Sequence, residues 1–180
     1  TVGPATGVAT GCRTRSPRPG VVSGTATACR VLLSWAETGG ARLRADHVLC
    51  NEVCVELRDW RFRSSSHQGA LQFPTDSTSV IYEEACRLLR EFWDGTPVRL
   101  IGIRTGKISD HAFVQMSLFE TEQDRKRLKM EQAVDQIRSQ FGTDSIKRAS
   151  FLKKDSLVEH AASRHKHLGR SEEGEGYENS

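Results

Sequence analysis

The sequence predicts an α+β fold: a four-stranded antiparallel or mixed sheet, three-stranded if the first strand is missing, with two helices on one face and a C-terminal helix. Three observations support it. Residues 53–58 alternate between apolar and polar side chains, which indicates a half-buried strand. Residues 81–92 have helical periodicity and end before Gly95. The predicted order of helix, strand, strand, helix and strand is that of a split βαβ unit once one strand is added ahead of the first helix.

Composition limits what the chain can be. Its 180 residues are 37% hydrophobic and 27% charged, which favours one modest core with solvated extensions. The net charge of +3 is too small to indicate nucleic-acid binding by itself. No apolar run could cross a bilayer and no signal pattern opens the chain, so we expect a cytoplasmic protein. The five cysteines are odd in number and irregularly spaced, which favours reduced structural thiols over disulfides or a metal site.

The N-terminal part of the chain is predicted to contain an irregular stretch followed by a helix. Residues 1–28 are rich in Gly, Ala, Thr, Pro and Arg, and we expect them to be irregular or disordered. From Cys29 to Arg44 the apolar residues fall near one helical face, although Gly39 and Gly40 weaken this helix.

The strands and the second helix follow. A strand is predicted over residues 51–62, and a basic, hydroxyl-rich turn over residues 63–68 leads to a second strand over residues 69–73. Asp76 or Ser77 can cap the next helix, and a last strand covers residues 98–105. On that strand Leu100, Gly102 and Arg104 share one face, where a glycine beside a cation would let a ligand backbone approach.

The last part of the chain contains a short motif and a helix. Gln115-Met-Ser-Leu-Phe shows neither strand nor helical period, and its adjacent Leu118 and Phe119 could anchor in a groove on another protein or simply begin the next helix. A helix is predicted over residues 120–141, with an apolar stripe of Met130, Val134, Ile137 and Phe141. A short extended piece over residues 145–152 and a disordered tail follow. The predicted units are therefore residues 1–28, 29–112, 113–152 and 153–180.

Several stretches together resemble the little-finger domain of Y-family translesion DNA polymerases, the bacterial DNA polymerase IV class. The similarity runs from about residue 31 to residue 152, and it is carried by residues 53–62, Phe73-Pro-Thr-Asp, residues 88–93, residues 97–104 and the pentapeptide at 115–119. The resemblance implies a domain that grips primer–template DNA, independently of sequence, with the open face of its sheet. It also implies a role in DNA repair, translesion synthesis and the SOS response, with binding to damaged DNA.

The resemblance assigns two groups of contact residues. The DNA-binding candidates are Arg63, Ser64, Ser65, Ser66, His67, Gln68, Arg99 and Arg104, while Glu56 is an awkward charge for the same face. The sliding-clamp-binding candidates are Gln115, Met116, Ser117, Leu118 and Phe119. By this resemblance, the Gln115 amide would form a hydrogen bond at the rim of the clamp pocket, and Leu118 and Phe119 would fill its hydrophobic floor.

The departures from the family are also informative. Its members hold two Mg²⁺ ions in a palm domain, and no acidic pair on a strand hairpin matches that palm here. We therefore expect no metal or other cofactor in this chain, no catalytic residue, and a monomer that binds DNA and the clamp without incorporating nucleotides. The alternatives are a DNA polymerase IV-like nucleotidyltransferase and a regulatory clamp-binding protein. A frameshifted stretch within residues 4–29 would explain the missing first strand and would leave one sheet edge unpaired.

Overall fold

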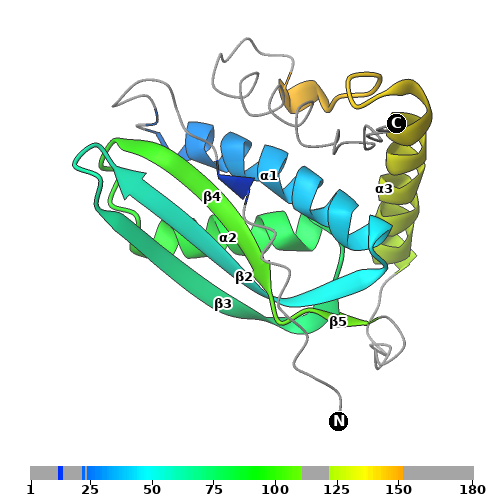
Figure 1. The fold of residues 1–180 in the computed structure, drawn as a ribbon, viewed down its shortest axis with the longest axis horizontal. Coiled ribbons are helices and arrows are strands. Elements are labelled where there is room, and N and C mark those ends of the chain that lie inside the picture. The colour runs from blue at the N-terminus through cyan, green and yellow to red at the C-terminus, as the bar shows by residue number, and fades with distance from the viewer. Residues whose placement is uncertain (1–11, 14–21, 23, 111–121, 152–180) are drawn as a thin grey trace, which may run out of the picture.

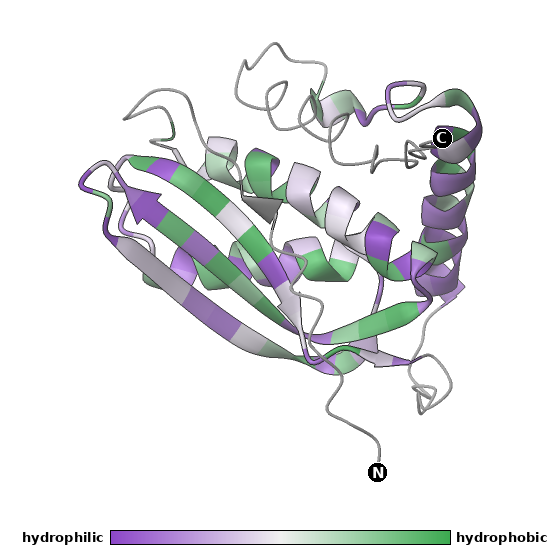
Figure 2. Cartoon of the chain, viewed as in Figure 1, coloured by the Kyte–Doolittle hydropathy of each residue, from purple (hydrophilic) through white to green (hydrophobic). Residues whose placement is uncertain are grey.

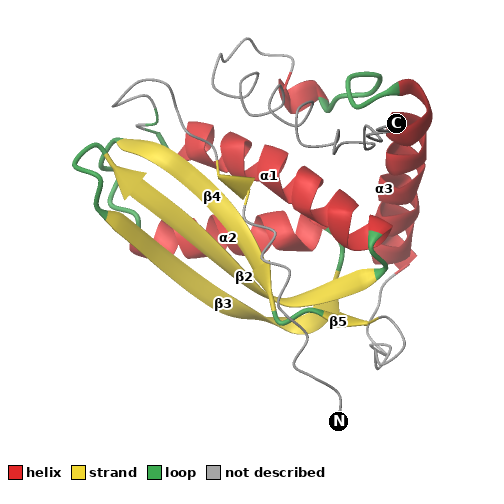
Figure 3. Cartoon of the chain, viewed as in Figure 1, coloured by secondary structure: helices red, strands yellow, loops and turns green. Residues whose placement is uncertain are grey.

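The computed structural model describes residues 12–13, 22, 24–110 and 122–151, and it has three helices and a sheet in that part of the chain (Figures 1 and 3). The helices are α1 (Thr25–Ala45), α2 (Thr78–Phe92) and α3 (Glu122–Phe141). The strands are β1 (Cys12–Arg13), β2 (Val48–Asp59), β3 (Ser64–Thr75), β4 (Val98–Gly106) and β5 (Ser109–Asp110). A 3₁₀ turn spans Ala149–Phe151.

The sheet is antiparallel, with β2 at its centre. The strand order is β1-β4-β2-β3, and β5 pairs with the start of β2. Val55 of β2 lies opposite His67 on one side and Ile103 on the other. The predicted α+β class with a four-stranded sheet is confirmed. The hypothesis of a missing first strand is wrong at Cys12 and Arg13, because both pair with β4.

Helices α1 and α2 cover one face of the sheet, as expected (Figure 1). Val53, Val55 and Leu57 point into the shared core, where Leu32 of α1 and Leu88 of α2 are fully buried. Burying such side chains stabilises the fold by roughly 1.5–3 kcal/mol each. Figure 2 shows the alternating hydropathy of β2 that puts these side chains on one face and polar ones on the other.

Three predicted boundaries differ from the structure. Helix α1 begins at Thr25, inside the stretch expected to be irregular. Residues 64–68, predicted as a turn, are the first part of β3, because they complete a ladder with residues 54–58 of β2. The piece expected to be extended after α3 contains a 3₁₀ turn instead. None of the helices in the described ranges is long and apolar enough to cross a bilayer.

The cysteines in the described segments from residue 24 onward are free and buried: Cys29, Cys50, Cys54 and Cys86. Burial raises the pKa of Cys50 to about 12 and that of Cys86 to about 12, so both thiols stay protonated at neutral pH. The expectation of reduced structural cysteines agrees with these four positions.

Helix α3 docks through charged side chains, which differs from the prediction. In the predicted apolar stripe, Met130 is 51% exposed and Phe141 is 73% exposed, and Ile137 is also exposed. Glu131, on another side of the helix, is buried instead with only 3% exposure. Of the four residues in the predicted stripe only Val134 is partly buried, so the stripe contributes little to the contact between α3 and the domain.

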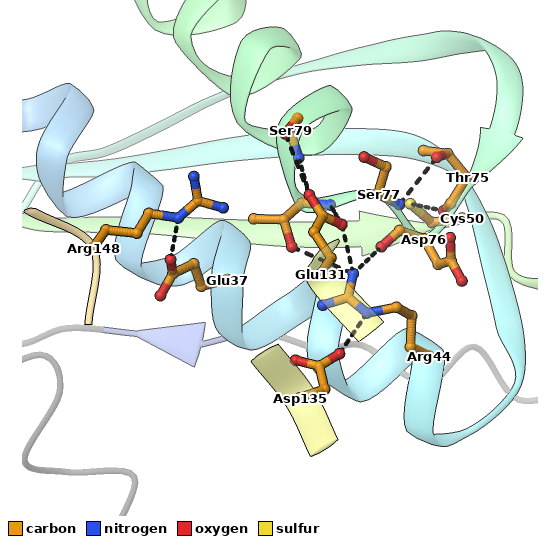
Figure 4. A network of polar contacts seen from close by, with 11 residues as sticks. Glu37, Arg44, Cys50, Thr75, Asp76, Ser77, Ser79, Glu131, Asp135 and Arg148 are labelled. Atoms are coloured by element: carbon orange, nitrogen blue, oxygen red, sulfur yellow. Dashed lines mark hydrogen bonds and ion pairs between the residues drawn. The ribbon is translucent and has the colours of Figure 1, made fainter. Parts of the chain in front are cut away.

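Glu131 joins α3 to the N-terminus of α2 (Figure 4). The N-cap of α2, Ser77, makes no side-chain capping bond. The Glu131 carboxylate instead accepts hydrogen bonds from the backbone N–H of Thr78 at 3.0 Å and of Ser79 at 3.2 Å. A negative charge there also favours the helix dipole. Glu131 therefore caps α2 from a helix that lies more than 50 residues further along the chain.

Arg44, in the last turn of α1, completes the same network. Its Nη1 donates to Glu131 at 3.0 Å and to the Asp76 carbonyl at 2.7 Å, and its Nε donates to Asp135 at 2.6 Å. A buried carboxylate stays charged at low cost only when it is paired and fully hydrogen-bonded, and Arg44 supplies that pairing. Nearer the start of α1, Glu37 accepts from Arg138 at 3.2 Å and from Arg148. Together these contacts attach α3 and the segment after it to α1.

Gly40 provides a test of the contact between α1 and α2. A Cβ at this position would lie 2.6 Å from Thr78 Oγ1 and 3.1 Å from the Asp76 carbonyl oxygen, whereas at Gly39 it would meet nothing within 4 Å. We predict that Gly40→Ala lowers the free energy of unfolding by about 1–3 kcal/mol through overpacking. Gly39→Ala should raise it by up to about 1 kcal/mol through helix propensity. Urea denaturation measures both, and equal effects of the two substitutions would contradict this assignment.

Glu131 gives a second prediction. Glu131→Gln removes the charge that pairs with Arg44 and caps α2, so it should lower stability by about 2–4 kcal/mol. Hydrogen exchange should then show the amides of α3 losing protection before those of the sheet. Glu122→Gln, at an exposed position paired with Lys126, is the matched control and should change stability little. Unchanged protection of α3 in Glu131→Gln would overturn this account of the docking.

Candidate nucleic-acid interface

One face of the sheet is not covered by any helix in the described part of the chain, and we call it the outer face. Its members follow from the ladder, because directly opposite residues point the same way. The outer face comprises Glu52, Cys54, Glu56 and Arg58 of β2, Ser64, Ser66, Gln68 and Ala70 of β3, and Leu100, Gly102 and Arg104 of β4. The predicted grouping of Leu100, Gly102 and Arg104 on one face agrees with this register.

Arg104 is the cation nearest the middle of the outer face. Its Nη2 lies 3.7 Å from Cys54 Sγ and its Nε 3.9 Å from Glu56, and its side chain remains 46% exposed. The hydrogen bond to Cys54, together with the charges of Glu56 and Glu52, raises the pKa of Arg104 further above its usual value. The guanidinium is therefore charged at every accessible pH, and it is held by the sheet while much of it still faces solvent.

The charges on this face are mixed. Lys107 Nζ lies 3.1 Å from Glu52, and Arg58 Nε donates to Ser64 at 2.9 Å. Glu56, expected to be an awkward charge here, does lie on the outer face beside Arg104. Because surface pairs of this kind contribute little in water, the cations remain available to a stronger anion.

Four of the eight predicted contact residues lie together on the outer face: Ser64, Ser66, Gln68 and Arg104. Sequence reasoning left out Arg58 and Lys107, which lie on or beside the same face. The alternation over residues 53–58 did predict that Arg58 lies on the polar face of this strand, but the resemblance did not assign it as a DNA contact.

Ser65 and His67 lie on the helix side of β3. They pair with Leu57 and Val55, whose side chains are buried in the core. The His67 ring packs 5.7 Å from Phe92 of α2, and its Nε2 lies 3.2 Å from Glu91. These two residues are therefore separated by the sheet from the outer-face group.

Arg99 and Arg63 lie at the end of the sheet near the β2–β3 turn. The β2–β4 ladder is irregular here: Arg58 pairs with Leu100 but Asp59 pairs with Val98, so Arg99 has no direct partner on β2. Such irregularities redirect side chains. The Arg99 guanidinium accordingly stacks 4.1 Å from the centre of the Phe62 ring.

Arg63 is tied to Asp59 across the turn. Its backbone N–H and its Nε each donate to the Asp59 carboxylate at 2.9 Å. Desolvation alone would raise the pKa of Asp59, but these bonds and the charge of Arg63 outweigh it, so that pKa lies below its usual value. A depressed folded-state pKa stabilises the turn at neutral pH, and this contribution is lost as the pH falls through that pKa.

Two other predictions concern the clamp-binding peptide and the binding of metal. The pentapeptide Gln115, Met116, Ser117, Leu118 and Phe119 lies outside them. Within the described ranges, no three His, Cys, Asp or Glu side chains are grouped so that they could hold a metal ion.

The comparisons with known proteins identify the family. The impB/mucB/samB family C-terminal domain matches residues 15–118, which is more than half of the chain. The chain therefore belongs to this family, and the matched part includes α1, α2 and strands β2 to β5. The predicted resemblance to the C-terminal region of Y-family DNA polymerases is confirmed.

The curated relatives are bacterial DNA polymerases. The chain is 30% identical over 126 residues to DNA polymerase IV of Clostridium acetobutylicum, covering 70% of this chain and 32% of the relative. It is 34% identical over 126 residues to DNA polymerase IV 2 of Bacillus subtilis, covering 68% and 30%. It is 28% identical over 116 residues to DNA polymerase IV 1 of the same organism, covering 63% and 28%. The chain thus spans about a third of the length of these relatives.

Proposed function

We propose that this chain is a DNA-binding module of a Y-family translesion polymerase, and that it holds primer–template duplex against the outer face of its sheet. The observation that carries the proposal is the grouping of Arg58, Arg104 and Lys107 with serine hydroxyls and Gln68 on a face that no described helix covers. Guanidinium, ammonium and hydroxyl groups are the usual donors to phosphate oxygens. They carry no base code, so the binding would be independent of sequence.

The dimensions of the sheet suit a duplex. Strand β2 has 12 residues, and at about 3.3 Å per residue it extends over about 40 Å. The outer-face part of β2, residues 52–58, extends over about 20 Å. One turn of B-form DNA is about 34 Å long, so the outer face can follow the backbone over a little more than half a turn. The modest net charge agrees with a module that steadies DNA and does not bind it tightly on its own.

The wider role follows from the relatives. Their printed names state DNA polymerase IV, and we propose nucleotidyl transfer for a whole protein in which this module grips DNA during translesion synthesis and repair, including the SOS response. Mg²⁺ would belong to its palm. The chain itself would act as a cytoplasmic monomer. A primer-extension assay with this chain distinguishes a non-catalytic binding module from an active nucleotidyltransferase. We expect that the chain incorporates no nucleotides.

We also propose that residues 115–119 bind the bacterial sliding clamp. Support comes from the sequence: a Gln amide is followed at short spacing by adjacent Leu118 and Phe119, as in a peptide with two apolar anchors. In such a peptide Gln115 would bond at the pocket rim, Leu118 and Phe119 would fill its floor, and Met116 would pack beside them.

The outer face gives the first functional prediction. Arg104→Ala should weaken duplex binding about threefold or more at low salt and reduce the slope of log K against log salt by about one, because one phosphate contact is lost. Glu56→Gln should strengthen binding, because it removes a carboxylate 3.9 Å from Arg104. Arg90→Ala, which removes the same charge from α2 on the other layer, is the control and should have little effect. Fluorescence anisotropy with labelled duplex measures all three, and equal losses for Arg104→Ala and Arg90→Ala would refute the outer-face assignment.

The pentapeptide gives the second. Replacing both Leu118 and Phe119 with alanine should reduce clamp affinity at least about 100-fold, since buried anchors of this kind contribute about 2 kcal/mol or more each. Duplex binding should remain. Met130→Ala, which removes an exposed apolar side chain from α3, is the matched control. Titration calorimetry with purified clamp gives the affinities, and an unchanged value for the double variant would remove the clamp proposal. If the intact chain also displaces other polymerases from the clamp, the regulatory alternative gains support.

A further inference from the structure

The turn between β2 and β3 presents two aromatic rings to solvent. Trp60 is 50% exposed and Phe62 is 65% exposed. The turn between β2 and β3 lies at the end of the sheet far from α3 (Figure 1). Aromatic side chains normally contribute to stability through burial, so two of them exposed on one short turn suggest a binding role. We call residues 60–63 together with Arg99 the turn tip.

Each ring in the turn tip is stacked with a guanidinium. Arg61 lies 4.6 Å from the centre of the Trp60 ring, and Arg99 lies 4.1 Å from the centre of the Phe62 ring. In the described part of the chain neither guanidinium forms an ion pair with a carboxylate. The cation–π contacts orient the rings, and at least half of each aromatic residue still remains accessible to a further planar group.

The backbone holds the rings in place. Phe62 has φ of +65°, a left-handed conformation that costs a non-glycine residue of order 1 kcal/mol. It is stabilised by Asp59, whose carbonyl accepts from Phe62 N–H at 3.1 Å and whose N–H donates to the Arg63 carbonyl at 3.0 Å. A turn that is already ordered loses little entropy when it binds a ligand.

The chemistry of the turn tip selects the ligand. Arg61 and Arg99 stack on the two rings, Arg63 follows Phe62 in the sequence, and Asp59 is the carboxylate that braces the turn from within. An apolar protein partner would have to bury these guanidinium groups at considerable cost. A single strand of nucleic acid offers unpaired bases to stack on the rings and phosphates to meet the arginines. In duplex, the faces of internal bases are already stacked.

We propose that the turn tip is a stacking platform for unpaired bases of single-stranded DNA, at the end of the face assigned to duplex. The inference goes beyond the proposed function because it involves different residues and a different form of DNA. A strand leaving the duplex at this end of the sheet would meet Trp60 and Phe62.

The test compares oligothymidylate with an abasic oligonucleotide of equal length, which keeps the phosphates and lacks the bases. The chain should bind oligothymidylate more tightly than the abasic strand. Trp60→Ala combined with Phe62→Ala should weaken oligothymidylate binding about tenfold or more, and leave abasic-strand and duplex binding within about twofold. Phe73→Ala, at another exposed aromatic position on β3, is the matched control and should bind like the unaltered chain.

The single variants Trp60→Ala and Trp60→Phe keep the test valid if the double variant folds poorly, which thermal unfolding would reveal. Trp60→Phe should retain most of the affinity for oligothymidylate, because a ring remains for stacking. Equal losses on the thymidylate and abasic strands would overturn the proposal, as would unchanged thymidylate binding in Trp60→Ala. Loss of duplex binding in Arg104→Ala tests the outer face separately, so the two proposals can fail independently.

Discussion

The register of the central strand determines both layers of this protein. β2 pairs with β3 on one side and with β4 on the other. Val53, Val55 and Leu57 point toward the helices and are buried in the core. The opposite residues, including Glu56 and Arg58, must then face outward. A slip of one residue would bury these charges and expose the valines, at a cost of several kcal/mol. The position of every outer-face cation on β2 therefore depends on three apolar side chains that are buried in the core.

That register could be predicted from the sequence because it has a local signal. The period-two alternation of β2 and the helical periodicity of α2 can each be recognised within about a dozen consecutive residues. The same reasoning placed Arg104 and Gly102 on one face. Arg99 differs, since its direction depends on an irregular step between β2 and β4 that has no signature in either strand alone. The resemblance assigns His67 to the DNA contacts together with its serine neighbours, but alternation within β3 turns it toward Phe92.

The docking of α3 could not be predicted for a related reason. Its buried contact is a carboxylate paired with Arg44, 87 residues away along the chain, and charged residues on a helix usually face water. Only the tertiary arrangement shows that the N–H groups of Thr78 and Ser79 at the start of α2 are shielded from water and require an acceptor. The apolar residues of α3 were identified correctly, but the direction in which they point depends on the position of Glu131.

The buried thiols make the domain insensitive to its oxidative surroundings. Cys50 and Cys86 have pKa values raised to about 12 by burial, so the nucleophilic thiolate is scarce as well as inaccessible. Peroxide and electrophiles can therefore react with them only after the sheet and helices separate. The rate at which an alkylating reagent modifies these thiols would therefore depend on opening of the core. Thiol labelling would thus measure how often the folded domain opens.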